Sequence, residues 1–285
     1  MTAPAYQPCL TVSVVVYHLD VPVITNALES LQIAADEAFL AGLMTELRIT
    51  LVDNADAPQN QQNLLSLLDS LPAPTIPCTR KLISGHGNIG YGRGHNLVIE
   101  RLAACTQDFY LILNPDVFLA QDALVQGLTW LTAHPHAVAV APAVQNGDGD
   151  IVSACKRFPS VLDFLLRGFA PARVKAMFRR RLDHYEMSDL PRDKPTEDIP
   201  LISGCFMLFR HAPLQSLNGF DPRYFLYFED FDLSIRAHQL GSLSYVPTMN
   251  ITHLGGQSAR KGLRHILMFG RSLVRFFNAH GWRWV

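Results

Sequence analysis

The chain has 285 residues, of which 48% are hydrophobic and 17% are charged, and its formal net charge is −1. This length fits one large domain or two small ones, and the balance of 24 basic against 25 acidic residues argues against a nucleic-acid partner. The low charged fraction leaves apolar surface for a large core and for contact with an apolar partner.

The first half of the chain alternates strand and helix patterns. Residues 9–17 form a continuous apolar, β-branched run that predicts a buried strand, and residues 21–43 follow with helical spacing. Further strands are expected at 47–55, 80–85, 108–117 and 137–144, and further helices at 61–71, 92–105 and 121–134. The alternation predicts an α/β fold with a mostly parallel central sheet covered by helices.

The pattern changes after Asn146. An aromatic and basic segment at 147–182 precedes a Pro-rich polar stretch at 187–200, which is expected to be a loop. A strand is expected at 201–210 and a helix at 229–241. The tail predicts an amphipathic helix, with Arg264, Arg271 and Arg275 opposite its apolar face. The apolar residues of that face are Leu263, Ile266, Leu267, Gly270, Leu273, Val274 and Phe277.

Cysteine use and the N-terminus bear on the compartment. The five cysteines are scattered without a C-x-x-C pair, so neither a disulfide framework nor a zinc site is predicted. The N-terminus lacks the basic start of a secretory signal, and no apolar run reaches the roughly 18 residues of a membrane span. We therefore expect a cytoplasmic protein. Its basic segments, 155–195 and 254–285, suit a peripheral contact with the inner face of the cell membrane.

Polar residues follow the predicted strands at the edge where ligands of such sheets bind. Asp53 and Asn54 either contact a nucleobase or ribose or cap a turn, and these alternatives carry about equal weight. The glycines between 85 and 94 let the backbone approach a phosphate, although a flexible loop has the same composition. Asp116 follows another strand, where a carboxylate either forms a turn or binds Mg²⁺ or Mn²⁺.

Two later features also have competing explanations. In "YFLYFEDFDLSIRA", the carboxylates Glu229, Asp230 and Asp232 stand beside an aromatic run. They either begin a helix, where negative charge is favoured, or are reactive groups at the rim of a pocket. His253 precedes two glycines, and a solitary histidine of this kind is more often structural than a ligand.

The motifs taken together resemble a known family. "SVVVYHLD", "LVDN", "GNIGYGRGHN", "LNPDV", "SGCFMLFRH", "GFDPRYFLYFEDFDLSIRA" and "THLGGQS" occur between about residues 11 and 260 in the order found in family 2 glycosyltransferases with the GT-A fold. "KRFPSVLDFL" and "RSLVRFF" are similar to segments of the bacterial rhamnosyltransferases of O-antigen (lipopolysaccharide) and cell-wall assembly. These enzymes use a dTDP-rhamnose donor.

The resemblance implies a role for each motif. Asp230 would be the general base, with Glu229 orienting the acceptor or Arg236. Asp116 would be the remaining carboxylate of a metal-binding D-x-D motif whose first acid is Asn114 here, and His253 a second metal ligand or diphosphate contact. The cofactor would be Mg²⁺ or Mn²⁺. The residues assigned to the nucleotide-sugar donor are Asp53, Asn54, Asn88, Gly90, Tyr91, Gly92, Arg93, Asn96, Asn114 and Arg260.

The implied reaction is an inverting transfer, in which a β-linked donor sugar gives an α-linked product.

 The acceptor would be a hydroxyl of a lipid-linked glycan on polyprenyl diphosphate, and L-rhamnose the transferred sugar. The whole chain, 1–285, would form a single GT-A domain, with a nucleotide-sugar-binding half at 9–118, an acceptor-binding half at 137–255 and a C-terminal helical region at 256–285.

Three alternatives remain open at this stage. A catalytically silent subunit that binds sugar nucleotides or glycans is favoured by the missing first acid at Asn114. A family 2 transferase could use a different nucleotide sugar, because these motifs carry little information on the sugar. A nucleotidyltransferase would need a similar nucleotide and metal site, but the N-terminal region lacks a basic signature for triphosphate activation.

Overall fold

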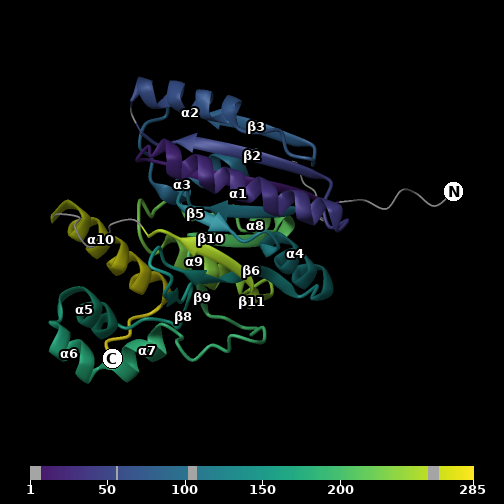
Figure 1. Cartoon of the computed structure of the whole chain (residues 1–285). Helices are drawn as coiled ribbons and strands as arrows, with labels where there is room; N and C mark the ends of the chain where they lie inside the picture. The colour runs from purple at the N-terminus through teal and green to yellow at the C-terminus, as the bar shows by residue number, and fades with distance from the viewer. Residues whose placement is uncertain (1–7, 56, 102–107, 256–262) are drawn as a thin grey trace.

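A central sheet of nine strands organises the chain (Figure 1). The computed structural model describes residues 8–55, 57–101, 108–255 and 263–285, without the side chains of Leu263 and Arg264. The strands follow the order β3 (Cys78–Ile83), β2 (Glu46–Asp53), β1 (Cys9–Val16), β4 (Phe109–Leu113), β10 (Phe206–Arg210), β6 (Ala137–Gln145), β11 (Ser242–His253) and β5 (Val117–Leu119), and β7 (Ile151–Val152) pairs with β6.

The sheet is mixed but mostly parallel, as the sequence predicts. β1 pairs in parallel with β2 and β4, β2 pairs in parallel with β3, and β11 pairs in parallel with β6. β10 runs antiparallel to both of its neighbours, β4 and β6. The first amino acids of β10 therefore lie at the same edge of the sheet as the last amino acids of β4.

Two predicted strands are each divided in the structure. The strand expected at 108–117 becomes β4 and β5. A turn at residues 114–116 separates them, and β5 pairs with β11 as the last strand of the sheet. The strand expected at 201–210 becomes β9 (Leu201–Ile202) and β10, separated by residues 203–205. β9 pairs with β8 (Cys155–Lys156) in a separate two-stranded sheet. Both interruptions place polar backbone at the edge of the main sheet.

The four helices expected in the first half are confirmed, with bounds that differ by a few residues. They are α1 (Val21–Leu40), α2 (Pro58–Ser70), α3 (Tyr91–Ile99) and α4 (Ala123–Ala133). α1 begins where the Asp20 carboxylate accepts a hydrogen bond from the Val23 N–H at 3.2 Å, which satisfies one free donor of the first turn. Residues 102–105, the end of the expected third helix, lie outside the described residues.

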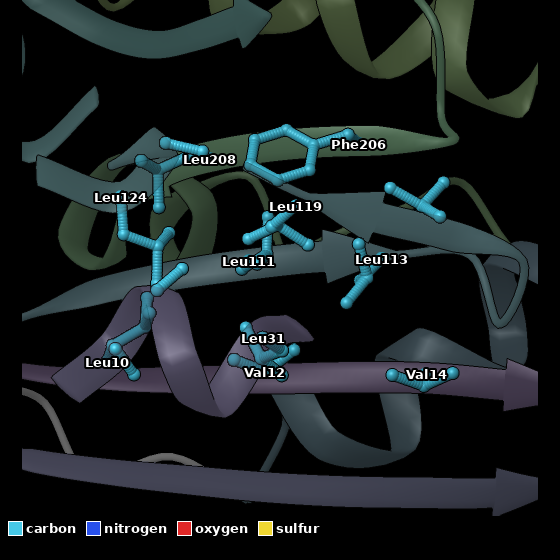
Figure 2. Packing of buried hydrophobic residues seen from close by; sticks show 14 of the residues in the cluster. Leu10, Val12, Val14, Leu31, Leu111, Leu113, Leu119, Leu124, Phe206 and Leu208 are labelled. Atoms are coloured by element: carbon cyan, nitrogen blue, oxygen red, sulfur yellow. The ribbon is translucent and has the colours of Figure 1, made fainter. Parts of the chain in front are cut away.

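The core lies on both faces of the sheet, which explains the continuously apolar strands. Figure 2 shows one face, where Leu10, Val12 and Val14 of β1 pack with Leu111 and Leu113 of β4 and other aliphatic side chains. Val15 points to the opposite face because side chains alternate along a strand, and it packs with Tyr110 and Ile112. Each fully buried aliphatic side chain contributes about 1.5–3 kcal/mol to the stability of the fold.

The helices of the C-terminal half occupy two positions (Figure 1). α8 (His211–Ser216) and α9 (Glu229–Ala237) pack on one face of the sheet through Leu214 and Leu233, whereas α5 (Val161–Phe169), α6 (Ala172–Met177), α7 (Arg179–Tyr185) and α10 (Leu263–His280) gather beside it. α8 follows β10 directly. Side chains from α5, α7, α9 and α10 and from the segment before α9 form an aromatic cluster whose buried members are Phe164, Tyr185, Tyr224, Phe228, Phe276 and Phe277.

The predicted apolar face of α10 is wrong in part. Phe277 is buried and Leu273 is partly buried, as expected, but Ile266, Leu267 and Val274 are exposed. The helix rotates because it packs against the aromatic cluster, which takes in Phe269 and Phe276 instead. Within the described part of the chain, no helix has the length and apolar composition needed to cross a bilayer.

Candidate active site

Several polar groups meet at one edge of the sheet because of the strand register. Val16, the last residue of β1, stands beside Asp53 at the end of β2, and Leu113 at the end of β4 stands beside Phe206 at the start of β10. β11 ends at His253, which pairs with Val117 of β5. Asp53 and Asn114 therefore lie where their strands end, as the sequence predicts for a ligand-binding edge, and the structure adds His253 at the end of β11.

Asp53 and Asn54 organise the turn that follows β2. Asp53 is buried and accepts a hydrogen bond from the Ala55 N–H at 3.0 Å, and burial raises the pKa of its carboxyl, while that hydrogen bond and His86 oppose the rise. The Asn54 side chain donates to the Gly90 carbonyl at 3.0 Å and to the Asn88 side chain at 3.3 Å. Asn54 thus ties the glycine-rich loop to the sheet edge.

The glycine-rich loop has a backbone that only glycine adopts easily. Gly85, Gly87 and Gly90 all have positive φ. A Cβ atom added at Gly90 would overlap the carbonyl oxygen of Phe225, which accepts a hydrogen bond from the Tyr91 N–H at 3.0 Å. The Asn88 side chain accepts a hydrogen bond from the Gly90 N–H at 3.1 Å. The loop is therefore fixed, and it contacts the segment that leads into α9.

The remaining predicted donor residues occupy α3 in different ways. The Tyr91 hydroxyl donates to the Gly204 carbonyl at 2.6 Å, and Gly92 packs against the Phe220 ring. Arg93 is exposed and its Nε donates to the Pro222 carbonyl at 2.6 Å. Asn96 is buried and exchanges two hydrogen bonds with the backbone of Phe220. The structure does not test the donor roles assigned to these residues, and Arg260 lies outside the described residues.

Asp116 and His253 converge beside the turn after β4. Oδ1 of Asp116 lies 3.3 Å from Nε2 of His253, and Nδ2 of Asn114 lies 3.4 Å from the same nitrogen. Burial opposes the charged imidazolium, but hydrogen bonds to Asp116 and Cys205 outweigh it and raise the pKa of His253 to about 10. A metal ligand must give up its proton, so a cation would compete with a proton at this histidine.

The spacing of Asp116 and His253 fits a divalent cation. Adjacent ligands of an octahedral Mg²⁺ ion are about 3 Å apart, and such ions keep waters and bind substrate phosphates. Among the described residues, no group of three or more His, Cys, Asp or Glu side chains is arranged to hold a metal ion. Two protein ligands beside Asn114 therefore suit a cation that a diphosphate helps to bind, rather than a closed structural site.

Glu229 and Asp230 begin α9 after a strained segment. Tyr227 and Phe228 are consecutive non-glycine residues with φ of 72° and 68°. Such conformations each raise the energy by about 1–3 kcal/mol and cluster at functional sites. Asp230 accepts hydrogen bonds from the Gly204 N–H and the Phe231 N–H, both at 2.9 Å. Two carboxylates thus follow the strained segment directly. Asp230 contacts the loop at Gly204, whose carbonyl also accepts the hydrogen bond from the Tyr91 hydroxyl.

The two neighbouring carboxylates differ in their surroundings. Glu229 is 4% exposed, and within the described chain its Oε2 has no hydrogen-bond partner. Burial, reinforced by the charge of Asp230, raises the pKa of Glu229 to about 8. Burial also raises the pKa of Asp230, but the hydrogen bonds from Gly204 and Phe231 oppose the rise. Glu229 therefore holds a proton at neutral pH more readily than Asp230, which is the better base of the pair.

The carboxylate that binds Arg236 is not the expected one. Glu229 was expected to orient the acceptor or Arg236, but Arg236 is bound by Asp232 at 2.8 Å instead. Asp232 is buried and also contacts Nε2 of His280 at 2.8 Å, so it joins α9 to α10. The i,i+4 spacing of Asp232 and Arg236 on one helix face explains this pairing. Asp232 is a structural residue rather than only a helix-start charge.

A cavity of about 270 Å³ opens beside Glu229 and Asp230. The sequence analysis did not assign its other polar lining groups, which come from β8, α5 and α7. The lining residues are Ser153, Lys156, Phe164, Arg167, Tyr185, Ser203, Leu226, Tyr227, Phe228, Glu229, Asp230, Phe231 and Phe269. The basic and aromatic composition of 147–182 was the available signal, but it did not indicate which of its side chains face the carboxylates.

Comparisons with known proteins show which proteins this chain is related to. No family model matches the chain. It is 29% identical over 233 residues to N-acetylglucosaminyl-diphospho-decaprenol L-rhamnosyltransferase of Mycobacterium tuberculosis, covering 76% of this chain and 71% of that protein. It is 27% identical over 179 residues to rhamnosyltransferase WbbL of Escherichia coli K12, covering 60% of this chain and 62% of that protein. The chain is a glycosyltransferase related to the bacterial rhamnosyltransferases.

A solved structure supports the fold of this glycosyltransferase. The mannosyltransferase PcManGT from Pyrobaculum calidifontis, solved with GDP-Man and Mn²⁺, superposes with a TM-score of 0.60 at 17% sequence identity. The match covers 97% of this chain and 65% of that structure. At this identity the likeness concerns the fold alone, and it confirms the GT-A-like arrangement of a mixed sheet flanked by helices.

Proposed function

We propose that this glycosyltransferase moves L-rhamnose from dTDP-rhamnose, with inversion, to a hydroxyl of a lipid-linked glycan in cell-surface polysaccharide synthesis. The observation that carries the proposal is the carboxylate pair of buried Glu229 and partly buried Asp230, which follows a strained segment at the start of α9 and lines a cavity. The rhamnose donor and the lipid-linked acceptor come from the names of the two relatives.

The donor would bind along the sheet edge formed by residues 9–118. Asp53 would contact the nucleoside, and the fixed loop through Asn88 and Gly90 would line the pocket. Asp116 and His253 would hold Mg²⁺ or Mn²⁺ near the diphosphate. When bound, the cation would neutralise negative charge that develops on the leaving nucleotide.

The chain's own residues would carry out the proton transfer. An acceptor hydroxyl is a poor nucleophile until it loses its proton, and Asp230 would accept that proton as the oxygen attacks the anomeric carbon. The bond from that carbon to the diphosphate oxygen breaks in the same step, and dTDP leaves. Attack from the face opposite the leaving group inverts the anomeric centre, so a β-linked rhamnosyl donor gives an α-linked product.

The acceptor-binding half, 137–255, and the C-terminal region would lie near the lipid carrier. α6 buries none of its side chains, and Phe169, Met177 and Trp284 are exposed nearby. Exposed Arg173, Arg179 and Arg180 accompany them. Apolar and basic side chains on one surface suit a peripheral contact with anionic lipid. Arg275 contributes less, because it donates a hydrogen bond to the Arg223 carbonyl.

A transfer assay tests the proposal. The purified protein is incubated with Mg²⁺ or Mn²⁺, a lipid-linked glycan extract and one of a panel of nucleotide sugars, with Asp230→Asn as the matched control. Transfer from dTDP-rhamnose by the wild type and its loss in the variant support the proposal. Transfer from another donor only would refute the rhamnosyl assignment, and no transfer from any donor would refute the enzyme assignment.

A silent binding subunit is the second candidate, and Asn114 in place of an acid favours it. Thermal shift separates the two candidates, because a ligand that binds the native state raises the melting temperature. A shift with dTDP-rhamnose but no transfer would favour the silent subunit. Chelation by EDTA adds a further arm, since full activity without metal would refute the roles of Asp116 and His253.

A further inference from the structure

The cavity beside Asp230 contains two cations that the proposed chemistry leaves unused. Lys156 comes from the end of β8 and Arg167 from the last turn of α5, whereas Glu229 and Asp230 come from α9 on the other wall. Elements far apart in the sequence thus place positive charge and the proposed base in one cavity of about 270 Å³. A ligand in this cavity would meet both charges at once.

The positive charge of this wall is only partly compensated. Nζ of Lys156 donates to the Ser153 carbonyl at 2.8 Å, which is a neutral partner. Nε of Arg167 lies 3.0 Å from Oε1 of Glu186, and its guanidinium lies 5.5 Å from the centre of the Tyr185 ring. Glu186 lines a neighbouring cavity with Arg167 rather than this one. The Glu186 carboxylate therefore compensates part of the charge of both Arg167 and Lys156.

The burial of Lys156 has the same implication. Burial lowers the pKa of Lys156 to about 8, the charge of Arg167 lowers it further, and Glu186 opposes both. A buried ammonium group gains most from an anion that is close and shielded from water. The cavity therefore offers a phosphate two cationic contacts, the partly buried Lys156 ammonium group and the more exposed Arg167 guanidinium.

The other walls suit a sugar. The Tyr185 hydroxyl and Oε2 of Glu229 are buried and have no hydrogen-bond partner among the described residues. Buried polar atoms usually have partners, so a bound hydroxyl group would satisfy them. Phe164, Tyr227 and Phe269 supply apolar surface on which a sugar ring can pack. The combination of hydroxyl-binding, apolar and cationic groups matches a sugar that carries phosphate.

We propose that Lys156 and Arg167 bind the phosphate or diphosphate attached to the accepting sugar, and that one sugar fills the cavity between this anion and Asp230. The proposal rests on the proposed function and deepens it. It limits the acceptor to a sugar joined directly to the diphosphate, because a cavity of about 270 Å³ leaves little room for further sugars between the two groups. The end of a long glycan would not reach both.

Matched acceptors test the subsite. One is a sugar diphosphate with a short alkyl chain, and the other is the alkyl glycoside of the same sugar without phosphate. For Lys156→Met and Arg167→Gln, we expect KM for the diphosphate acceptor to rise tenfold or more, with KM for the neutral acceptor and the donor unchanged. Arg101→Gln, an exposed residue outside the cavity, is the control and should leave all three values unchanged.

Several results would overturn the subsite. They are equal wild-type KM values for the two acceptors, equal losses on both acceptors in the variants, or a stronger preference for an acceptor that carries a sugar carboxylate in place of phosphate. Arg167→Lys retains the charge and should recover part of the affinity, which separates recognition of the anion from a general loss of structure. Circular dichroism and melting temperatures establish that each variant is folded.

Calorimetry separates failure of the subsite from failure of the proposed function. If the wild type transfers no sugar from any donor, the proposed function fails, but binding of the alkyl sugar diphosphate can still be titrated. Binding that is at least tenfold weaker in Lys156→Met and unchanged in Arg101→Gln supports the subsite. No binding by the wild type, or equal binding by all proteins, overturns it.

Discussion

The proposed donor edge and the proposed acceptor cavity of this glycosyltransferase differ in how their polar side chains are hydrogen-bonded. At the donor edge, Asn54 and Asn96 are fully engaged with the backbone of the glycine loop and of Phe220. In the acceptor cavity, Glu229 and Tyr185 have buried polar atoms without partners among the described residues. The comparison teaches that one region uses polar side chains to fix a backbone, whereas the other keeps them available for a ligand.

Asp230→Asn tests the proposed general base in the cavity and should have the largest effect on activity. An amide cannot take the acceptor proton, so we expect kcat to fall about 10²–10⁴-fold, the range of general base catalysis. Binding of the donor, measured by thermal shift, should not change. Glu229→Gln keeps a neutral side chain of the same shape and should retain more activity than Asp230→Asn. Equal activity of Asp230→Asn and the wild type would contradict the base assignment.

Asp232→Asn tests whether the polar groups of α9 are structural away from the cavity. Asp232 is buried and binds both Arg236 and His280, so its loss leaves the Arg236 guanidinium without its counter-ion and removes the carboxylate that contacts Nε2 of His280. Removal of one partner from a buried pair costs about 3–5 kcal/mol, and we expect this reduction in the free energy of unfolding by urea. Asp183→Asn breaks the exposed pair with Arg179 and should change it by less than about 1 kcal/mol. Similar losses in both variants would rule out a special role for Asp232.

Gly90→Ala tests the fixed backbone of the donor edge. Both Gly90 and Gly85 have positive φ, but only at Gly90 would a Cβ meet another group, the Phe225 carbonyl. Gly85→Ala should therefore lose about 1–2 kcal/mol from backbone strain alone. Gly90→Ala should lose roughly 1–3 kcal/mol more, because the added atom forces the loop away from Phe225. Urea denaturation of both variants measures the difference, and an equal loss would show that the close approach is unimportant.

The pH dependence of stability tests the unpartnered state of Glu229. Its pKa is raised to about 8 in the folded protein, so between about 4.5 and 8 the folded state holds a proton that the unfolded state has released. Stability should therefore fall as pH rises through this window, by at most about 1.4 kcal/mol per pH unit for one proton. Glu229→Gln should remove this slope. If urea midpoints of variant and wild type change in parallel with pH, Glu229 is not protonated as described.

Binding to vesicles tests the exposed surface at the acceptor side and should show the smallest effect per residue. Each basic residue near an anionic membrane contributes about 1 kcal/mol. Arg179→Gln with Arg180→Gln should weaken sedimentation with phosphatidylserine vesicles by roughly tenfold or more, and 0.5 M salt should do the same. A pair of exposed basic residues remote from this surface, Lys81→Gln with Arg101→Gln, serves as the control. Equal binding to neutral vesicles would contradict an electrostatic contact.

The sequence predicts regular elements better than their contacts. β1 and α1 have strong apolar periods, and their bounds differ from the prediction by few residues. Periodicity does not report strand direction, so the antiparallel placement of β10 was not foreseen. The face of α10 was partly wrong because its partner is an aromatic cluster assembled from distant segments. The sheet edge that carries Asp53 and Asn114 was foreseen, because parallel strands all end at the same edge of a sheet.

The same limit applies to the candidate site. Motif order indicated Glu229 and Asp230, but the pairing of Asp232 with His280 depends on how α10 docks 48 residues later. Lys156 and Arg167 enter the cavity because β8 pairs with β9 and α5 packs on the aromatic cluster. No local pattern encodes such long-range placement, so these cations could be recognised only in the folded chain.

Tyr91 links the two regions through its backbone N–H and its side-chain hydroxyl. Its N–H donates to the Phe225 carbonyl, before the strained segment, and its hydroxyl donates to the Gly204 carbonyl, next to the N–H that binds Asp230. A donor that shifts the glycine loop would therefore also shift the wall against which the acceptor rests. Such coupling is reciprocal, since each substrate must change the affinity for the other by the same factor. The enzyme would then behave as a single cooperative unit rather than as two independent pockets.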